Sequence, residues 1–121
     1  MVKALFDTNI LIDYLNGVPQ ARDEIQLYHD KAISIISWME VMVGADTRFE
    51  QASRAFLGRF QLIELNDRIA ACAVVLRRER RIKLPDAIIE ASAQVNGMLL
   101  VTRNTKDFDA GSPAVRIPYV L

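Results

Sequence analysis

The stretch VKALFDTNILIDYL at residues 2–15 decides the fold, because it joins a strand pattern directly to a helical one. Val2 to Phe6 is a short apolar run, which predicts a buried strand. The residues that follow repeat at helical spacing, with apolar side chains at Ile10, Leu11, Tyr14 and Leu15. Gly17 and Pro19 are expected to end this helix. Asp7 therefore lies at a junction between a strand and a helix.

The same alternation continues along the chain. Further strand patterns are expected at residues 32–36, 60–63, 98–101 and 114–117. Further helical patterns are expected at residues 20–30, 37–43, 47–58, 67–80 and 86–96. Strands that alternate with helices predict a parallel sheet with right-handed crossovers. We expect one α/β domain over residues 1–121, a length that allows one core.

The composition of the chain limits which classes of protein it can belong to. The chain is 51% hydrophobic but only 7% aromatic, so the core should be aliphatic. Fifteen basic residues balance fifteen acidic ones, which excludes a global positive field that attracts nucleic acid. The longest apolar run, Ile69 to Leu76, is far too short to span a bilayer. Only six residues precede Asp7, too few for a signal peptide, so we expect a cytoplasmic protein.

Acidic residues occupy four of the strand-to-helix junctions, at Asp7, Glu40, Asp86 and Asp107. Glu40 follows the apolar run AISIIS, Asp86 opens a helix after Pro85, and Asp107 follows the strand-like MLLVT. In a parallel sheet such junctions gather along the edge at the carboxyl ends of the strands. Clustered carboxylates repel one another and are usually held by a cation. The pattern therefore predicts a site for a divalent metal ion.

Each acid also has an ordinary structural interpretation. Asp7 could cap the first helix, and Ser37 with Glu40 matches a capping box. Asp86 suits the first turn of a helix, and Asp107 a polar loop. Together, however, the four acids could hold metal ions, and such ions can activate water for phosphodiester hydrolysis. The chain has no Ser/His/Asp set, Gly-rich phosphate loop or Cys/His zinc spacing that would favour another chemistry.

Four ordered blocks around these acids resemble a PIN domain, and more narrowly the VapC-type toxins of toxin–antitoxin pairs. The blocks are LFDTNILIDYL at 5–15, SWMEVMVGA at 37–45, LPDAIIEASA at 84–93 and LLVTRNTKDF at 99–108. The resemblance implies a three-layer α/β sandwich with a central parallel five-stranded sheet. It also implies a metal-dependent endoribonuclease that uses Mg²⁺ or Mn²⁺.

The resemblance assigns roles to particular residues. It places the metal ligands at Asp7, Glu40, Asp86 and Asp107. Asp107 would often act through a water molecule on the metal. Thr8 and Asn9 occupy the polar positions of the first block, and Thr102 and Asn104 match a T-x-N segment that orients the carboxylates or the water. The alternative for Thr102 and Asn104 is a turn with local side-chain-to-backbone bonds.

Two further acids lie on the same helices as proposed ligands. Asp13 comes nearly two turns after Asp7, and Glu90 one turn after Asp86. We expect both side chains to face solvent rather than to bind metal.

Basic residues near the acids are candidates to contact RNA. The densest run, RRERRIK at 77–83, leads into Asp86, and two more cations flank Asp107. The candidates are Arg80, Arg81, Lys83, Arg103 and Lys106. A local basic rim could hold RNA phosphates beside the metal. The alternative is a solvated helix end whose cations suit the helix dipole.

The high apolar content suggests that some aliphatic surface contacts a partner. The resemblance implies a homodimer and a small antitoxin that lies in a hydrophobic groove, in a higher-order assembly. Candidate groove residues are Leu11, Leu15, Trp38 and Met42. The alternative is that these side chains belong to the core.

Two other functions stay open from the sequence. A haloacid-dehalogenase-like phosphatase also has a strand that ends in Asp, but its motif needs a second Asp where this chain has Asn9. A PIN-like fold could also serve as a non-catalytic binding module.

Overall fold

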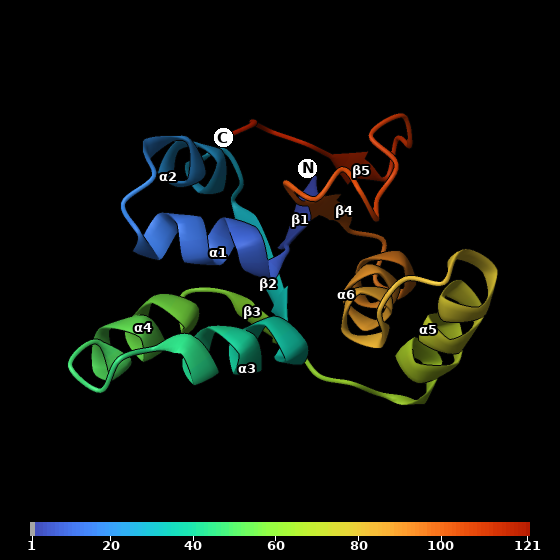
Figure 1. The fold of residues 1–121 in the computed structure, drawn as a ribbon, viewed down its shortest axis with the longest axis horizontal. Coiled ribbons are helices and arrows are strands. Elements are labelled where there is room, and N and C mark those ends of the chain that lie inside the picture. Colours follow the sequence, from blue (N-terminus) through green and yellow to red (C-terminus); the bar gives the residue numbers. More distant parts are fainter. Residues whose placement is uncertain (1) are drawn as a thin grey trace.

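The computed structural model describes residues 2–121, in which five strands form one sheet and six helices cover it (Figure 1). The strands are β1 (Lys3–Phe6), β2 (Asp30–Ser34), β3 (Gln61–Ile63), β4 (Leu99–Val101) and β5 (Val115–Arg116). The helices are α1 (Thr8–Leu15), α2 (Pro19–Gln26), α3 (Ile35–Gly44), α4 (Glu50–Leu57), α5 (Asp67–Arg80) and α6 (Leu84–Val95). The strand order is β3-β2-β1-β4-β5, and every neighbouring pair is parallel. The predicted parallel five-stranded sheet is confirmed.

The central strand β1 separates two cores, because successive side chains of a strand point to opposite faces. Leu5 packs into a core with residues of α5 and α6, whereas Ala4 and Phe6 pack into a core with residues of α1 to α4. Figure 1 shows α5 and α6 on one side of the sheet and α1 to α4 on the other. The predicted three-layer sandwich is therefore confirmed.

The two cores differ in composition. The core beside α5 and α6 is almost wholly aliphatic, with Phe108 as its aromatic member. The core beside α1 to α4 contains an aromatic cluster, in which Phe60 packs edge-on against Phe6 and Phe56, with ring centroids 5.8 and 5.2 Å apart. Tyr14 stacks on Phe56 at 4.2 Å. The prediction of an aliphatic core is wrong for this side, because most of the few aromatic residues gather there.

The junction between β2 and α3 lies two residues earlier than the sequence predicts. The Ser34 hydroxyl oxygen accepts a hydrogen bond from the Ile36 N–H at 3.1 Å, so Ser34 caps the helix. Ser37 instead lies inside α3 and is buried. Glu40 is therefore in the second turn of α3 rather than at the third position of a capping box. The capping-box interpretation of Ser37 and Glu40 is wrong.

Other boundaries differ as well, since α2 ends at Gln26 rather than at residue 30 and β2 begins at Asp30 rather than at residue 32. Pro19 opens α2 instead of terminating α1, because a proline at the first helical position loses no hydrogen bond. Gly17 takes a left-handed φ of 80° between the two helices, a conformation that favours glycine. α6 begins at Leu84, which places Asp86 within its first turn. α5 matches its predicted bounds of 67–80.

The cap assignment predicts that Ser34→Ala destabilises the protein by about 1 kcal/mol, because the first turn of α3 loses its side-chain acceptor. Urea unfolding at neutral pH measures this loss. Gln51→Ala, on the exposed face of α4, is the control and should change stability by no more than about 0.5 kcal/mol. An unchanged unfolding midpoint for Ser34→Ala would contradict the assignment.

Candidate functional site

Asp7 lies at the carboxyl end of the central strand and is only 3% exposed. Its Oδ1 accepts a hydrogen bond from the Thr8 N–H at 2.7 Å and so caps α1. Its own N–H donates to the carbonyl of Val101 at 2.9 Å, which ties this junction to the end of β4. The predicted capping role of Asp7 is confirmed, and it leaves Oδ2 for other partners.

The second oxygen of Asp7 is held by side chains from two segments. The Thr102 hydroxyl donates to Asp7 Oδ2 at 2.7 Å, and the Asn9 amide nitrogen donates to it at 3.1 Å. Thr102 follows directly after β4 and is fully buried. Its hydroxyl oxygen also accepts from the Asn104 N–H at 3.0 Å. Thr102 therefore both orients Asp7 and makes the local turn bond that the sequence left as an alternative.

The environment of Asp7 makes its negative charge costly. Burial raises the pKa of Asp7 from 3.8 to about 6. The hydrogen bonds from Thr102 and Thr8 lower it, while the nearby charges of Asp86 and Glu40 raise it further. Asp7, Asp86 and Glu40 are therefore close enough to act on one another electrostatically, and Asp7 is the most deeply buried of the four predicted acids.

Glu40, on α3, is linked to the site by a hydrogen bond from Thr8 on α1. The Thr8 hydroxyl donates to Glu40 Oε1 at 2.7 Å and lies 2.9 Å from the hydroxyl oxygen of Ser37. Glu40 is exposed, whereas Ser37 is buried beside it one turn earlier on α3. Sequence reasoning assigned Ser37 to a helix cap and missed this contact. The three-residue spacing to Glu40, which places both side chains on one helix face, is the signal that could have revealed it.

Asp86 and Asp107 complete the acidic cluster from α6 and from the loop after β4. Asp86 is half-buried, and burial raises its pKa, as do the charges of Asp107 and Glu40, while Lys83 lowers it. Asp107 accepts a hydrogen bond from the Asn104 amide nitrogen at 2.9 Å, and the Asp107 backbone N–H donates to Asn104 Oδ1 at 3.2 Å. The structure thus brings all four predicted acids to the carboxyl edge of the sheet.

The chemistry of this donor set suits a hard divalent cation. Its side chains offer carboxylate, hydroxyl and amide oxygens, the ligands that Mg²⁺ and Mn²⁺ prefer. Within residues 2–121, no three acidic, histidine or cysteine side chains lie together in a group that could hold a metal ion. Mg²⁺ usually keeps several of its waters and is bound through one or two carboxylates, so it does not require such a group. A bound cation would also offset the repulsion that raises the pKa of Asp7 and Asp86.

Asp13 and Glu90 are buried, so the expectation that they face solvent is wrong. Asp13 accepts hydrogen bonds from Arg103 Nε at 2.7 Å and Nη2 at 2.8 Å, and from the Tyr119 hydroxyl at 2.8 Å. Glu90 forms an ion pair with Arg80. The guanidinium groups of Arg80 and Arg103 are therefore engaged in ion pairs, although their side chains remain 36% and 34% exposed. The remaining candidates for RNA contact are exposed, namely Arg81, Lys83 and Lys106.

The groove candidates divide into core and surface residues. Leu11 is fully buried, so its assignment to an exposed groove is wrong. Trp38 and Met42 are half-buried and pack against the core beside α1 to α4. Leu15 is 38% exposed and lines a cavity of about 650 Å³. The other apolar residues of this cavity, which the sequence did not single out, include Ile12, Val41 and Phe49.

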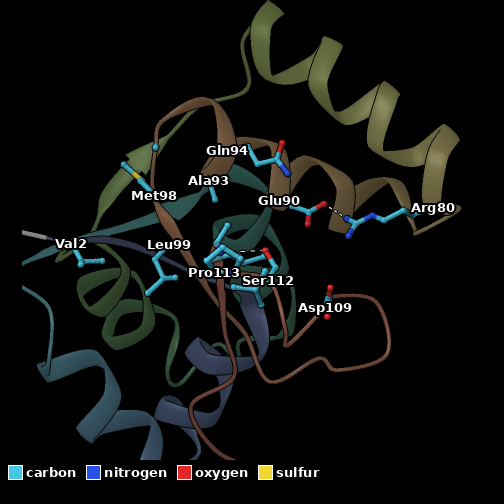
Figure 2. Close-up of a pocket in the computed structure, with 14 residues that line it drawn as sticks. Val2, Arg80, Glu90, Ala93, Gln94, Met98, Leu99, Asp109, Ser112 and Pro113 are labelled. Atoms are coloured by element: carbon cyan, nitrogen blue, oxygen red, sulfur yellow. Dashed lines mark hydrogen bonds and ion pairs between the residues drawn. The ribbon is translucent and has the colours of Figure 1, made fainter.

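A larger cavity of about 810 Å³ lies apart from the acidic cluster, and none of the four acids lines it. Figure 2 shows its walls, with Glu90 and Gln94 from α6, Leu99 from β4 and Pro113 from the loop before β5. Glu90 is already paired with Arg80 at its rim. The four predicted acids therefore lie at the carboxyl edge of the sheet and outside this larger cavity.

Comparison with known proteins gives consistent results. The family model of the PIN domain matches residues 4–111. A chain in a toxin–antitoxin complex from Klebsiella pneumoniae is 50% identical, with a TM-score of 0.92 over 98% of this chain and 100% of that chain. The tRNA(fMet)-specific endonuclease VapC of Shigella flexneri is 29% identical over 121 residues, which cover 90% of this chain and 92% of the relative. A chain of VapBC2 from Rickettsia felis, solved bound to a DNA fragment from the promoter of the pair, is 25% identical, with a TM-score of 0.79 over 96% of each chain.

The raised pKa predicts that Asp7→Asn stabilises the metal-free protein at pH 7.5. A folded-state pKa of about 6 against 3.8 corresponds to about 3 kcal/mol at most. Protonated Asp7 contributes its full stability below about pH 4, and this contribution is lost as the pH rises through about 6. The gain from Asp7→Asn should therefore shrink as the pH falls toward 4. Urea unfolding in the presence of a chelator measures it.

Glu24→Gln is the matched control for this prediction. Glu24 is also buried, but it is paired with Arg116, so its neutralisation should destabilise the protein at pH 7.5. A loss of stability for Asp7→Asn at pH 7.5 that equals the loss for Glu24→Gln would contradict the electrostatic account of Asp7.

Proposed function

The chain belongs to the PIN-domain family, and from this premise we propose that it is an endoribonuclease that depends on Mg²⁺ or Mn²⁺ and acts as the toxin of a toxin–antitoxin pair. The resemblance to VapC-type PIN domains is confirmed. The observation that carries the proposal is the buried Asp7 carboxylate, whose pKa is raised to about 6 by burial and by two neighbouring carboxylates. A site that concentrates negative charge in this way suits a cation that acts on a phosphodiester.

In this proposal Asp7, Glu40 and Asp86 hold the cation directly, and Asp107 acts directly or through water. When bound, the cation supplies activation of a water nucleophile and stabilisation of the leaving oxygen. The residues of the chain set the orientation of the ligands. Each of three acids has a hydrogen-bonding partner of its own, since Thr102 donates to Asp7, Thr8 to Glu40 and Asn104 to Asp107.

We further propose that exposed cations near the acids contact RNA phosphates. Lys83 precedes α6 and lies close enough to Asp86 to lower its pKa, and Lys106 adjoins Asp107. Arg81 lies between α5 and α6. Because the net charge of the chain is zero, RNA must be held locally by such residues. The Shigella flexneri relative is named for cleavage of tRNA(fMet), which makes a tRNA the first substrate to test.

For the antitoxin we propose the cavity between α1, α3 and α4. Ile12, Leu15 and Phe49 offer exposed apolar side chains there, and Val41 forms its floor. An amphipathic helix could lay its apolar face into such a groove. We also propose a homodimer that assembles further with the antitoxin. No helix in the described residues 2–121 is long and apolar enough to cross a membrane, and we propose a cytoplasmic location.

The two alternatives have less support. For a phosphatase of the haloacid-dehalogenase type, Asn9 stands where a general acid is needed. Its amide donates to Asp7 and Thr102 and accepts from the Arg103 N–H, so it acts as an organiser of the site. For a non-catalytic module, the helix cap that Asp7 provides would be explained, but the gathering of four acids at one edge of the sheet would not. Both alternatives predict no metal-dependent cleavage of RNA.

We expect Asp7→Asn and Asp86→Asn each to lower RNA cleavage by at least about 100-fold, because each removes a charge that stabilises the cation. Chelation should abolish cleavage by the parent, and added Mn²⁺ should restore it. The assay uses tRNA and proteins purified in parallel, which controls for contaminating ribonuclease. Asp109→Asn, at an exposed loop position outside the site, should retain the parent rate. Equal cleavage by Asp7→Asn and the parent would refute the nuclease proposal.

The antitoxin proposal predicts that Phe49→Glu weakens binding of the antitoxin by at least about 30-fold, because a charge would enter the apolar cavity. Phe49 is 58% exposed, so the substitution should leave the fold intact. Calorimetry with the product of the neighbouring antitoxin gene measures the affinity, and RNA cleavage by the free toxin should not change. Leu27→Glu, at an apolar position that is 66% exposed outside the cavity, is the control. If both variants bind equally well, the groove is elsewhere.

A further inference from the structure

An ion-pair cluster around the buried Asp13, beside the acidic site, has no role in the proposed chemistry so far. Asp13 on α1 is 5% exposed and accepts three hydrogen bonds, two from the Arg103 guanidinium and one from the Tyr119 hydroxyl. These residues lie on α1, on the loop after β4 and near the carboxyl end of the chain. A fork of two charge-assisted bonds fixes both the position and the orientation of Arg103.

The backbone of Arg103 connects this cluster to the site. Its N–H donates to Asn9 Oδ1 at 3.1 Å. The Asn9 amide nitrogen in turn donates to Asp7 Oδ2 at 3.1 Å and to Thr102 Oγ1 at 3.3 Å. Asn9 and Asp13 are one turn apart on α1, so a single helix face holds Arg103 by its backbone and by its side chain.

The neighbours of Arg103 are the residues that orient two of the acids. Thr102 precedes it and donates to Asp7, and Asn104 follows it and donates to Asp107. After Asn104 the loop has little anchorage to α1, because Thr105 and Lys106 are exposed. The position of Arg103 therefore sets the positions of Thr102 and Asn104 together.

We propose that Asp13, Arg103 and Tyr119 form a clamp that positions the loop at residues 102–107, so that Thr102 and Asn104 hold Asp7 and Asp107 ready for the cation. The three are positioning residues, since they act on the proposed cation site through Thr102 and Asn104. This inference rests on the proposed function and adds to it a tether from the carboxyl-terminal segment. It also gives the Arg103 side chain, which is 34% exposed, a positioning role in place of RNA contact.

The chain contains a second cluster of the same chemistry, which serves as a control. Glu24 on α2 is also 5% exposed and accepts two hydrogen bonds from the Arg116 guanidinium and one from the Tyr28 hydroxyl. Its link to the site runs through the backbone ladder, where the Arg116 carbonyl accepts from the Thr102 N–H. Glu24→Gln leaves that backbone bond in place. It should cost stability as Asp13→Asn does, without releasing the loop.

The test compares the parent, Asp13→Asn and Glu24→Gln in three measurements. These are Mn²⁺ affinity by calorimetry, amide hydrogen exchange at residues 103 and 104 in the metal-free protein, and kcat and KM for tRNA cleavage. Asp13→Asn should weaken Mn²⁺ binding by about tenfold or more, as loss of outer ligand support commonly does. It should also speed exchange at both amides and lower kcat with little change in KM. Glu24→Gln should keep Mn²⁺ affinity within about twofold of the parent.

If Asp13→Asn does not fold, two milder variants test the clamp instead. Tyr119→Phe removes one hydrogen bond, and Arg103→Lys keeps the charge but loses the fork, so both should change all three measurements in the same direction by less. Equal Mn²⁺ affinity and equal exchange for the Asp13 and Glu24 variants would overturn the clamp. If the parent neither binds Mn²⁺ nor cleaves RNA, the proposed function fails. The exchange comparison still decides on the clamp, which stands only if Asp13→Asn frees the two amides and Glu24→Gln does not.

Discussion

The buried carboxylate of Asp7, at the end of the central strand, is the constraint on which the site depends. A carboxylate removed from water is costly to ionise, and the neighbouring acids on α3 and α6 increase that cost. The fold nevertheless places hydrogen-bond donors on both oxygens of Asp7, which favours its charged form. Because these effects oppose each other, the pKa of Asp7 is about 6, and its carboxyl group changes between neutral and charged forms near that pH. A bound divalent cation would offset the repulsion from the neighbouring acids, and for this reason we propose metal-dependent chemistry.

The scaffold makes this arrangement possible through its parallel topology. Strands β1 and β4 are neighbours, so the segments that leave their carboxyl ends, α1 and the loop with Thr102, meet at one edge. Helices α3 and α6 deliver Glu40 and Asp86 to the same edge from opposite faces of the sheet. Hydrogen bonds between side chains far apart in the sequence then fix Asp7 and Glu40, and a local one from Asn104 fixes Asp107. The site is thus assembled from four segments, none of which would hold it alone.

Much of the fold could be predicted from local patterns, since the apolar runs and helical spacing identified five strands and located α5 at its observed bounds. The four acids were likewise predictable, because junctions of parallel strands share an edge. Features that depend on contacts between residues far apart in the sequence could not be predicted. Asp13 was expected to be solvated because its partner Arg103 lies ninety residues away. Leu11 was assigned to a surface because an apolar helical stripe does not say which residues meet the core. Serine is a good helix cap, and the chain has one at Ser34 and another at Ser37. The position where β2 ends makes Ser34 the cap of α3.

The most direct test of this account is the pH dependence of Mn²⁺ binding to the metal-free protein, measured by calorimetry in two buffers of different protonation enthalpy. Because Asp7 has a pKa of about 6, binding at about pH 5 must displace a proton. The account predicts release of about one proton per ion at that pH. The affinity should rise as the pH increases through about 6 and level off above about 7. An affinity that does not change with pH and no proton release would contradict it.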